Sequence, residues 1–362
     1  MRIAIVTPWF PTRVNPVSGS FVLKDATAFQ RAGLDILVLH LVPPHEDDGV
    51  RQTYVEGIRT IRIPMSTKNP VDMVRARASL TPYLEGADIV HTQALSAIEP
   101  FVFKRPKQPW VHTEHWSAIT TPSTLSEREQ KLLPYLLKMS ALPDVTVSVC
   151  QFLADAISPA RSKRIEIIPC QVPSPTRLMP RRPDPKDLRL ICTGALIERK
   201  DPIVAVKTLK VLQDRGHAVS LTWLGEGPLR ESAQQLVKEL GVNATFPGTK
   251  SPAEVRVALG EADMFFGPTR ADNFFVAAAE SIVNGRPLVV GANGGQGEYI
   301  DPRVGATVPV QDPVAYADAI EDVHRRTQNL SAQEIAATVG DRFEPHTIAR
   351  QYQQLYQELA GH

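Results

Sequence analysis

Cysteine, net charge and long apolar runs are all scarce in this sequence of 362 residues. There are three cysteines, Cys150, Cys170 and Cys192. An odd number of thiols, each in or beside an apolar, strand-like run, argues against a disulfide framework or a metal role, so we interpret them as buried thiols of a cytoplasmic protein. The 40 basic and 39 acidic residues leave a formal charge of +1, which provides no overall field for nucleic acid or an anionic membrane. We expect no nucleic-acid partner. Any partner must be recognised by a local group of residues and not by the overall charge.

No stretch approaches the roughly 20 apolar residues that cross a bilayer. We therefore expect no transmembrane segment and leave peripheral membrane contact open. The first residues, 1–6, form a short strand-like run that meets Pro8 almost at once. This start lacks both the length and the small-residue cleavage site of a secretory signal.

Two common ligand motifs are also absent. No Gly-x-Gly-x-x-Gly follows the first strand-like run, which disfavours an NAD-dependent Rossmann enzyme. His112 and His115 form a His-x-x-His pair, which by itself suggests a metal as readily as a sugar. Because the chain has no Asp-x-Asp pair and no third ligand at a fixed spacing, we expect no metal site.

Hydrophobic residues make up 43% of the chain, which is enough for two cores. Strand-like runs alternate with helical stretches, stop in a segment rich in Pro and Arg, and then resume. This alternation predicts an α/β fold with two mostly parallel, doubly wound sheets. We predict a Rossmann-like domain over 1–172, an exposed linker over 173–187, a second Rossmann-like domain over 188–344 and a final helix over 345–362. The strand-like runs are residues 3–7, 36–42, 58–63, 89–92, 145–150, 165–168, 188–193, 220–224, 244–246, 264–266 and 288–290.

The segment 272–280 places two carboxylates eight positions apart across the start of a helix. An apolar strand over 264–266 leads into a turn, and the helix is expected to begin at about Phe275. Free backbone N–H groups and the positive end of the helix dipole make such a start an anion site. Asp272 before the helix and Glu280 inside it could bind the hydroxyls of a sugar and a ribose, with a diphosphate between them. The layout suits a nucleotide sugar.

This segment, with Gly285-Arg286-Pro287 and Gly294-Gly295 after it, resembles the donor-binding signature of the retaining glycosyltransferases of family 4. The usual form of that signature is Glu-x7-Glu, a small-residue helix, Gly-x-Pro and a Gly-Gly turn. The resemblance extends over nearly the whole chain, through 15–22, 194–200, 225–229 and 246–248. It implies the GT-B architecture, in which two Rossmann-like domains face each other across a cleft. The N-terminal domain then binds the acceptor, the C-terminal domain binds the donor, and the last helix packs back on the N-terminal domain.

The resemblance also implies roles for the second half of the chain. Lys200 stabilises the departing diphosphate, Glu280 binds the ribose, and Asp272 takes the place of the glutamate that touches the donor sugar. The chain departs from the family pattern twice. Asp272 is one methylene shorter than glutamate, and Ala195 stands where an arginine is usual, with Arg199 and Arg270 as the nearest replacements. Backbone contacts to the donor are expected from Gly194, Gly248, Asn273, Phe274 and Phe275, with the two rings as core or cleft wall.

In the first half, the resemblance places His115 against both the donor sugar and the acceptor. Glu114, Trp116 and His91 are expected to line the acceptor side. Gly19 has two readings: a site where the missing side chain admits the donor phosphate or the acceptor, or a simple helix cap. Glu114 could act as a general base, but in retaining GT-B enzymes the departing diphosphate is thought to take the acceptor proton.

Together these features predict a retaining hexosyltransferase that moves a hexose-type sugar from a nucleoside diphosphate, UDP or GDP, to a hydroxyl of a small molecule, glycoside or glycan. The expected catalytic residues are His115, Lys200 and Asp272, and no cofactor is expected beyond the nucleotide-sugar co-substrate. Two alternatives stay open: a non-catalytic or regulatory sugar-nucleotide binder, and a GT-B relative such as a sugar-nucleotide 2-epimerase or a phosphorylase. The acceptor, the donor sugar and the oligomeric state are not specified by the sequence.

Overall fold

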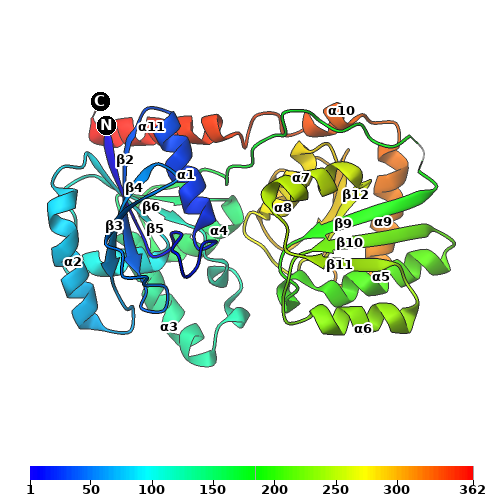
Figure 1. The fold of residues 1–362 in the computed structure, drawn as a ribbon, viewed down its shortest axis with the longest axis horizontal. Coiled ribbons are helices and arrows are strands. Elements are labelled where there is room, and N and C mark those ends of the chain that lie inside the picture. The colour runs from blue at the N-terminus through cyan, green and yellow to red at the C-terminus, as the bar shows by residue number, and fades with distance from the viewer. Residues whose placement is uncertain (184, 362) are drawn as a thin grey trace. The chain divides into compact units, whose positions relative to one another are not determined.

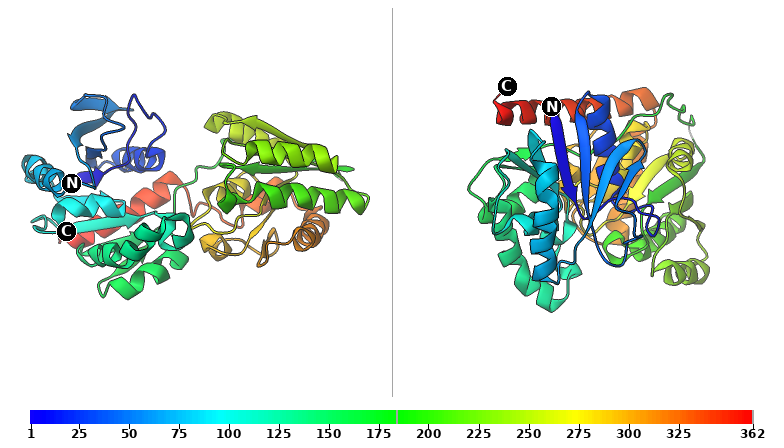
Figure 2. Two further views of the ribbon diagram at one scale, coloured as in Figure 1. Left: turned by 90° about the horizontal axis from the view of Figure 1, so that it is seen from below. Right: turned by 60° about the vertical axis from the view of Figure 1, so that its left-hand side comes forward.

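The computed structural model describes residues 1–183 and 185–361, so Asp184 in the predicted linker and His362 at the end of the predicted last helix lie outside the described residues. The chain divides into two compact units (Figure 1). The first unit comprises Met1–Gln171 together with Glu344–His362, and the second comprises Val172–Phe343. Helices lie on both faces of each sheet (Figure 2).

The first unit is built on an eight-stranded sheet with the order β3-β4-β2-β1-β5-β6-β7-β8. Its strands pair in parallel except for β3 and β4, which form an antiparallel hairpin around Glu56 and Gly57. Both turn residues have positive φ, as a two-residue hairpin turn requires. The strands are β1 (Arg2–Thr7), β2 (Asp35–Val42), β3 (Gln52–Val55), β4 (Ile58–Pro64), β5 (Ile89–Gln93), β6 (Trp110–Glu114), β7 (Val145–Ser148) and β8 (Ile165–Ile167).

Successive residues of the central strand β1 enter different cores, because side chains alternate between the two faces of a strand. Ile3 and Ile5 join the cluster under α1 and α11, whereas Ala4 and Val6 join the cluster under α2 and η1. Burial on both faces explains why this strand reads as a continuous apolar run. The helices of this unit are α1 (Ser20–Arg31), α2 (Pro70–Leu84), η1 (Leu95–Phe101), α3 (Glu127–Leu137), α4 (Gln151–Ile157) and α11 (Pro345–Ala360).

Helix α11 belongs to the first unit although it follows the whole second unit in the chain. Its apolar stripe includes Ile348, Tyr352 and Tyr356, all buried beside α1. Two hydroxyls at the buried face also bind the sheet: Tyr352 Oη lies 2.9 Å from Thr113 Oγ1, and Tyr356 Oη lies 2.7 Å from His91 Nδ1. The helix is therefore fixed by packing and by buried hydrogen bonds.

The second unit is built on a six-stranded parallel sheet with the order β11-β10-β9-β12-β13-β14. The sequence predicted five of these strands and missed the short β14, whose four residues carry little hydrophobic signal. The strands are β9 (Asp187–Thr193), β10 (Ala218–Leu224), β11 (Ala244–Gly248), β12 (Met264–Gly267), β13 (Leu288–Gly291) and β14 (Gly305–Val308). The helices are α5 (Pro202–Asp214), α6 (Arg230–Leu240), α7 (Pro252–Glu261), α8 (Val276–Val283), α9 (Pro313–Thr327) and α10 (Ala332–Ala336).

The segment expected to be an exposed linker, 173–187, is attached to the second unit where it is described. Arg181 donates to the carbonyl of Leu330 at 2.7 Å, and Arg182 forms ion pairs with Asp187 and Asp263. The buried guanidinium of Arg286 also donates to the carbonyl of Met179 at 3.0 Å. The described residues of this segment are exposed or half-buried, as expected, and the arginine contacts tie the segment to the second unit.

No helix among the described residues is long and apolar enough to cross a membrane. Cys150 and Cys192 are buried as expected, whereas Cys170 is half-buried.

Candidate functional site

In the second unit, the loops after two neighbouring strands carry the charged residues that the sequence singled out. Strand β9 ends at Thr193 and leads through Gly194 to Arg199 and Lys200 before α5, and strand β12 leads through Asp272 into α8. Because β9 and β12 are adjacent and parallel, their carboxyl ends lie at the same edge of the sheet. The topology therefore brings the two loops together.

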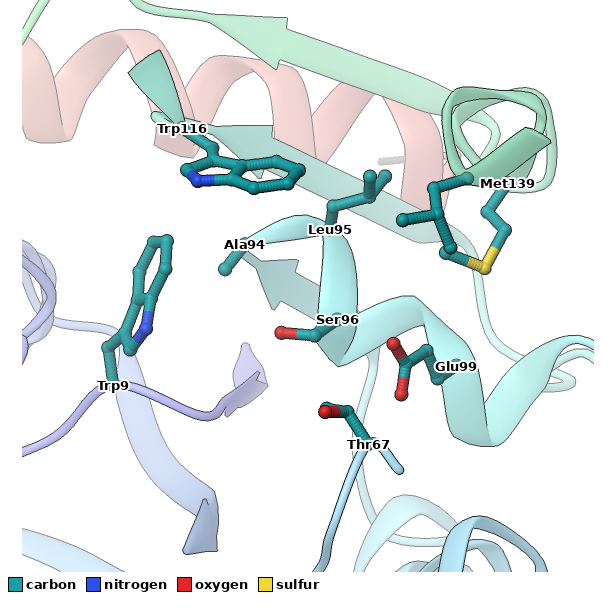
Figure 3. Close-up of a pocket in the computed structure, with 9 residues that line it drawn as sticks. Trp9, Thr67, Ala94, Leu95, Ser96, Glu99, Trp116 and Met139 are labelled. Carbon is teal, nitrogen blue, oxygen red and sulfur yellow. The ribbon is translucent and has the colours of Figure 1, made fainter. Parts of the chain in front are cut away.

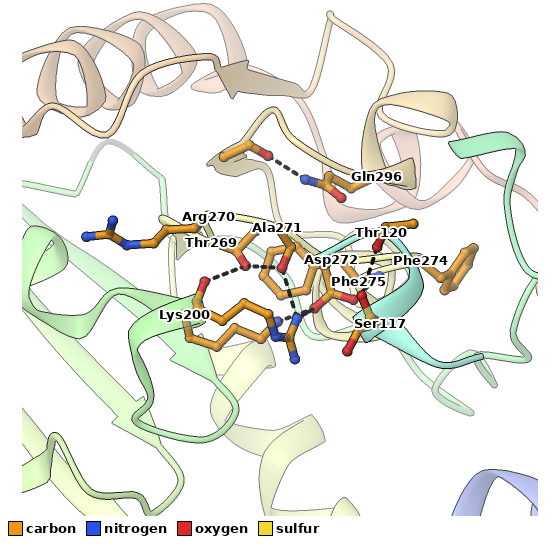
Figure 4. A network of polar contacts seen from close by, with 12 residues as sticks. Ser117, Thr120, Lys200, Thr269, Arg270, Ala271, Asp272, Phe274, Phe275 and Gln296 are labelled. Carbon is orange, nitrogen blue, oxygen red and sulfur yellow. Dashed lines mark hydrogen bonds and ion pairs between the residues drawn. The ribbon is translucent and has the colours of Figure 1, made fainter. Parts of the chain in front are cut away.

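The side chains from these loops form a compact cluster, which we call the Lys200 cluster: Arg199, Lys200, Asp272 and Phe275. Figure 4 shows Lys200, Asp272 and Phe275 close together. Lys200 Nζ lies 2.5 Å from Asp272 Oδ2, and Arg199 Nη1 lies 2.8 Å from the same oxygen. The other carboxylate oxygen, Oδ1, accepts the backbone N–H of Phe275 at 3.2 Å. The Lys200 ammonium also sits 3.7 Å from the centre of the Phe275 ring, a cation–π contact.

Burial and charge act in opposite directions on the two central groups. Burial lowers the pKa of Lys200, and the carboxylate of Asp272 opposes that shift only in part. Burial would raise the pKa of Asp272, but the charges of Lys200 and Arg199 outweigh it and hold that pKa below its usual value. Within the cluster, two cations share one carboxylate, so the cluster carries a net positive charge that favours an anionic ligand.

Helix α8 begins where the sequence predicted. Phe275 is the residue before its first turn and has a φ of 55°, a left-handed conformation that is unusual for a residue with a bulky side chain. The conformation is held by Tyr299, whose hydroxyl donates to the carbonyls of Phe274 and Phe275 at 3.0 and 2.9 Å. The first turn of α8, next to Lys200, adds helix-terminal N–H groups to the positive charge.

The structure distinguishes between the two arginines proposed to replace the missing one at Ala195. Arg199 enters the Lys200 cluster and also donates to the carbonyl of Ala271 at 2.9 Å. Arg270 instead binds Asp201 at 2.8 Å, and its side chain is 56% exposed. Arg199 is therefore the arginine that accompanies Lys200.

The other residues expected at the donor side lie around the same sheet edge. The carbonyl of Asn273 accepts the N–H of Gly295 at 2.8 Å, and the ring of Phe274 packs on Tyr299 and Phe343, as expected of core. Glu280 is half-buried, one turn into α8.

Two predicted glycines have backbones that glycine suits. Gly194 has a φ of 137°, and a Cβ added there would meet only Lys200 Cε, at 3.8 Å. Gly248, at the end of β11, has a φ of 86°, and an added Cβ would press on the Glu226 carboxylate at 2.7 Å. Both glycines are explained by backbone conformation, and Gly194 also leaves the space beside Lys200 open.

In the first unit, Glu114 ends β6 with its carboxylate fully engaged. Its Oε1 accepts the N–H groups of His115 and Trp116, both at 2.8 Å, and its Oε2 lies 3.3 Å from His112 Nε2. Burial would raise the pKa of Glu114, but His112 and the two amides outweigh it and lower that pKa. Glu114 therefore shapes the turn after β6, and these contacts do not support its expected place in acceptor binding or as a base.

His91 was expected to line the acceptor side, but the structure places it in the core. Its Nε2 lies 2.7 Å from Thr113 Oγ1, and its Nδ1 lies 2.7 Å from the hydroxyl of Tyr356. Burial, with smaller contributions from His112 and His115, lowers its pKa to about 3, so the ring is neutral. With both ring nitrogens bound inside the unit, His91 is a core residue. The sequence could not show this, because Tyr356 comes from α11.

His115 follows Glu114 at the same strand end. Its ring centre lies 4.6 Å from that of Phe21, and burial lowers its pKa to about 4, so the imidazole is neutral near pH 7. The His-x-x-His motif forms no chelate here: no group of three or more His, Cys, Asp or Glu suited to a metal occurs in residues 1–183 and 185–361. His115 remains a candidate for hydrogen bonding to a substrate hydroxyl.

Gly19 caps α1 with a φ of 59°, and a Cβ there would lie 2.0 Å from the carbonyl oxygen of Trp9. The backbone of the loop after β1 fills the space that the missing side chain leaves. Of the two readings of Gly19, the structure supports the helix cap and close packing within the chain.

Comparison with known families agrees with this geometry. Residues 19–173 match the model of "Glycosyltransferase Family 4", and residues 179–337 match that of "Glycosyl transferases group 1". The chain belongs to glycosyltransferase family 4. In this family 4 protein, the two matched regions correspond to the two units.

Individual relatives share only part of their sequence with this chain. A GDP-mannose-dependent α-(1-6)-phosphatidylinositol monomannoside mannosyltransferase of Mycolicibacterium smegmatis is 27% identical over 157 residues, 41% of each chain. The match thus spans about two fifths of that relative's length. Among solved structures, the sucrose-phosphate synthase of Thermosynechococcus elongatus superposes with a TM-score of 0.78 at 20% identity, over 100% of this chain and 99% of the other. Anabaena HepE in complex with UDP and glucose superposes with a TM-score of 0.74 at 15% identity, over 99% and 100%. These similarities confirm the predicted GT-B fold.

Proposed function

We propose that this protein transfers a hexose from a nucleoside-diphosphate sugar to a hydroxyl of a glycan, glycoside or small-molecule acceptor, with retention of the anomeric configuration. The observation that carries the proposal is the Lys200 cluster. Two half-buried cations share one carboxylate beside the N-terminus of α8, at the carboxyl ends of two parallel strands. A diphosphate has the charge and the acceptor oxygens that such a site favours.

The printed names of related proteins guide the choice of donor. The mycobacterial relative uses GDP-mannose, and HepE was crystallised with UDP and glucose. Mannose on GDP is therefore the first donor to test, and glucose on UDP the second. We further propose that the reaction takes place in the cytoplasm and needs neither a metal nor a resident cofactor, so a chelator should leave it unchanged.

In the proposed reaction, a bond forms between the acceptor oxygen and the anomeric carbon while the bond from that carbon to the diphosphate oxygen breaks on the same face. The acceptor proton passes to the departing diphosphate. Lys200, Arg199 and the first turn of α8 stabilise the negative charge that develops there. The neutral ring of His115 orients the reacting hydroxyl.

This assignment changes the expected role of Asp272. Both of its oxygens are bound, one to the two cations and one to the N–H of Phe275. A carboxylate so placed holds Lys200 in position and caps the turn before α8. We therefore propose Asp272 as a positioning residue for Lys200 first, with a contact to the donor sugar through a remaining lone pair as an addition.

Thermal unfolding with GDP, UDP, ADP and TDP tests the donor site. A ligand that binds the folded protein stabilises it by about 2.7 kcal/mol at a hundredfold excess over Kd. We expect stabilisation by GDP or UDP and no added effect of magnesium. No stabilisation by any of the four nucleotides would contradict the donor site.

Product analysis with the donor so identified tests the reaction. The anomeric configuration of the product, measured by NMR with an acceptor panel, should match that of the donor sugar. Conversion of the donor to an isomer without any acceptor would indicate an epimerase, and binding without turnover across the panel would indicate a non-catalytic binder.

A further inference from the structure

The first unit contains a pocket that no sequence motif pointed to, although one predicted residue, Trp116, borders it (Figure 3). The pocket has a volume of about 270 Å³ and is lined by Trp9, Ala94, Leu95, Ser96, Glu99 and Trp116, among others. All of these residues belong to the first unit. The volume lies near the lower end of the range for small-molecule sites, so the occupant is about the size of one ring.

The position of the pocket follows from the sheet. Trp9 lies just after β1, Ala94 just after β5 and Trp116 just after β6, and these three strands are neighbours in the order β1-β5-β6. Ligands of doubly wound sheets bind outside the carboxyl ends of the strands. The pocket thus occupies the part of the first unit where a ligand is expected on topology alone.

The backbone at the pocket floor is strained. Ala94 has a φ of 75° and a ψ of 142°, which residues with a Cβ rarely adopt. Such a conformation costs on the order of 1 to 3 kcal/mol, and positions of this kind concentrate at ligand sites. The strained link turns the chain from β5 directly into η1, whose residues Leu95, Ser96 and Glu99 then line the pocket.

The lining has two kinds of surface. Trp9 and Trp116 present their indole rings toward the space beside Ala94, while the Ser96 hydroxyl and the Glu99 carboxyl point into the same space from η1 (Figure 3). The buried oxygen Oε2 of Glu99 has no hydrogen-bond partner among the described residues. Burial in these apolar surroundings raises the pKa of Glu99 to about 7. A buried carboxyl oxygen without a partner is costly unless a ligand supplies one.

A chain of rings connects the pocket to His115. The Trp9 and Phe21 ring centres lie 5.7 Å apart, and those of Phe21 and His115 lie 4.6 Å apart. Trp116 is also the residue after His115. Ring contacts and chain neighbourhood therefore link the lining of the pocket to the residue proposed to orient the reacting hydroxyl.

We propose that this pocket binds a neutral sugar ring of the acceptor, with a C–H face of the ring against the indoles of Trp9 and Trp116 and a ring hydroxyl on Glu99. This inference rests on the proposed function and adds the class of acceptor. Glu99 is then a specificity-determining residue, because it distinguishes a ring with a hydroxyl at that position from one without it.

The chemistry of the lining argues against other occupants. Among the described residues that line the pocket none is basic, so a phosphate or carboxylate would meet the Glu99 carboxyl without a counter-charge. The nearby Arg77 is committed elsewhere, to Thr81 Oγ1 at 2.8 Å and to the carbonyl of Lys104 at 3.1 Å. A purely apolar ring would leave Oε2 of Glu99 without a partner.

Saturation-transfer NMR on the full-length protein tests the proposal with defined probes. These are the methyl α-glycosides of glucose, galactose and mannose, with cyclohexanol as a ring that has a single hydroxyl and methyl α-glucuronide as an anionic ring. At least one neutral glycoside should bind, whereas cyclohexanol and the glucuronide should bind about tenfold more weakly or not at all. No transfer to any neutral glycoside at its solubility limit would overturn the proposal.

Three variants locate the binding. Glu99→Leu should weaken the glycoside about tenfold, Glu99→Gln, which keeps a donor and an acceptor, should stay within about threefold, and Trp116→Leu should lose the contact to the ring face. Tyr135→Leu, at a residue of α3 that is 67% exposed and does not line the pocket, serves as the matched control. Equal binding by the wild type and Glu99→Leu would overturn the proposal.

Nucleotide binding, measured in parallel on the same variants by thermal unfolding, separates this inference from the proposed function. All four variants should bind GDP or UDP as the wild type does. If the nucleotide binds and the Glu99 and Trp116 variants leave glycoside binding and transfer unchanged, the pocket assignment is wrong while the proposed function stands. If no nucleotide binds the wild type, the proposed function itself fails.

Discussion

In the second unit, the loops after β9 and β12 bring Lys200 and Arg199 onto Asp272. In the first unit, the segments after β1, β5 and β6 place two indoles and Glu99 around one pocket, and the described residues that line it include no cation. The two carboxyls respond in opposite ways. Neighbouring cations outweigh burial and lower the pKa of Asp272, while burial alone raises the pKa of Glu99 to about 7. The same sheet topology thus provides a charged site in one unit and a nearly neutral site in the other. This division fits the proposed transfer from an anionic donor to a neutral acceptor.

The difference between the two units should have its largest effect on kcat. Lys200→Ala removes the cation that we propose stabilises the leaving diphosphate, so we expect kcat to fall by about two to three orders of magnitude and nucleotide affinity to fall as well. His115→Ala should lower kcat while nucleotide affinity stays unchanged. Steady-state kinetics measures kcat of the two variants, and nucleotide titration measures their affinity for the nucleotide. Activity of Lys200→Ala within a few-fold of wild type would place the essential cation elsewhere. A loss of nucleotide affinity in His115→Ala would contradict the assignment of nucleotide binding to the second unit alone.

The charged site should also depend on its carboxylate for stability. Asp272→Asn leaves two mostly buried cations without their anion, so we expect a loss of about 3 kcal/mol, measured by thermal and urea unfolding. Because the folded-state pKa of Asp272 is lowered, its contribution is present above the unfolded pKa and is lost as the pH falls through the folded value, below 3.8.

Ligand binding to the same variants separates positioning from sugar recognition. If Asp272 only positions Lys200, Asp272→Asn should weaken the nucleoside diphosphate and its sugar equally. If it also touches the sugar, the sugar nucleotide should lose about 1.5 to 3 kcal/mol more than the free diphosphate, and Asp272→Glu should change the preferred sugar.

A buried carboxyl in the first unit should have the opposite pH dependence. Asp25 on α1 accepts a hydrogen bond from Gln171 Nε2 at 2.7 Å, and burial raises its pKa from 3.8 to about 7. A carboxyl whose pKa is raised on folding favours the folded state at low pH. Stability should therefore decrease by about 2 kcal/mol between pH 5 and pH 7.

Calorimetry of the wild type and Asp25→Asn at the two pH values measures this effect. The variant keeps the acceptor for Gln171 and should show a smaller decrease. An identical decrease in both proteins would assign the pH dependence to other groups.

The smallest effect should come from the core of the first unit. Tyr356→Phe removes one buried hydrogen bond to His91, so we expect a loss of about 1 kcal/mol without a change in kcat/KM. Thermal unfolding and initial rates check both expectations. A loss of activity at unchanged stability would return His91 to the acceptor side.

The sequence predicted local features well because their causes are local. The start of α8 at Phe275 follows from an apolar strand, a turn and a run of small residues within about a dozen positions. One prediction that failed depended on a distant partner. His91 was expected to line the acceptor side from its place at a strand end, but Tyr356, 265 positions later in the chain, binds its ring in the core.

The cluster itself was predicted in part. Sequence reasoning directed Lys200 and the candidate Arg199 at the diphosphate and Asp272 at the donor sugar. It did not predict that both cations bind Asp272, because spacing along the chain does not show that side chains from two loops meet. The pocket around Glu99 gave no readable signal, since a glutamate in a short helical turn is ordinarily solvated and only the fold shows that its Oε2 atom is buried.

Helix α11 returns to the first unit after the chain has made the whole second unit. During synthesis on a ribosome, the second unit therefore emerges complete while the first still lacks one wall of its core. Until α11 arrives, Phe29 and His91 have neither Tyr352 nor Tyr356 to cover them. The second unit can thus fold independently of the first, whereas the first waits for residues made after the second. A nascent chain stalled before α11 should expose an apolar surface that chaperones recognise.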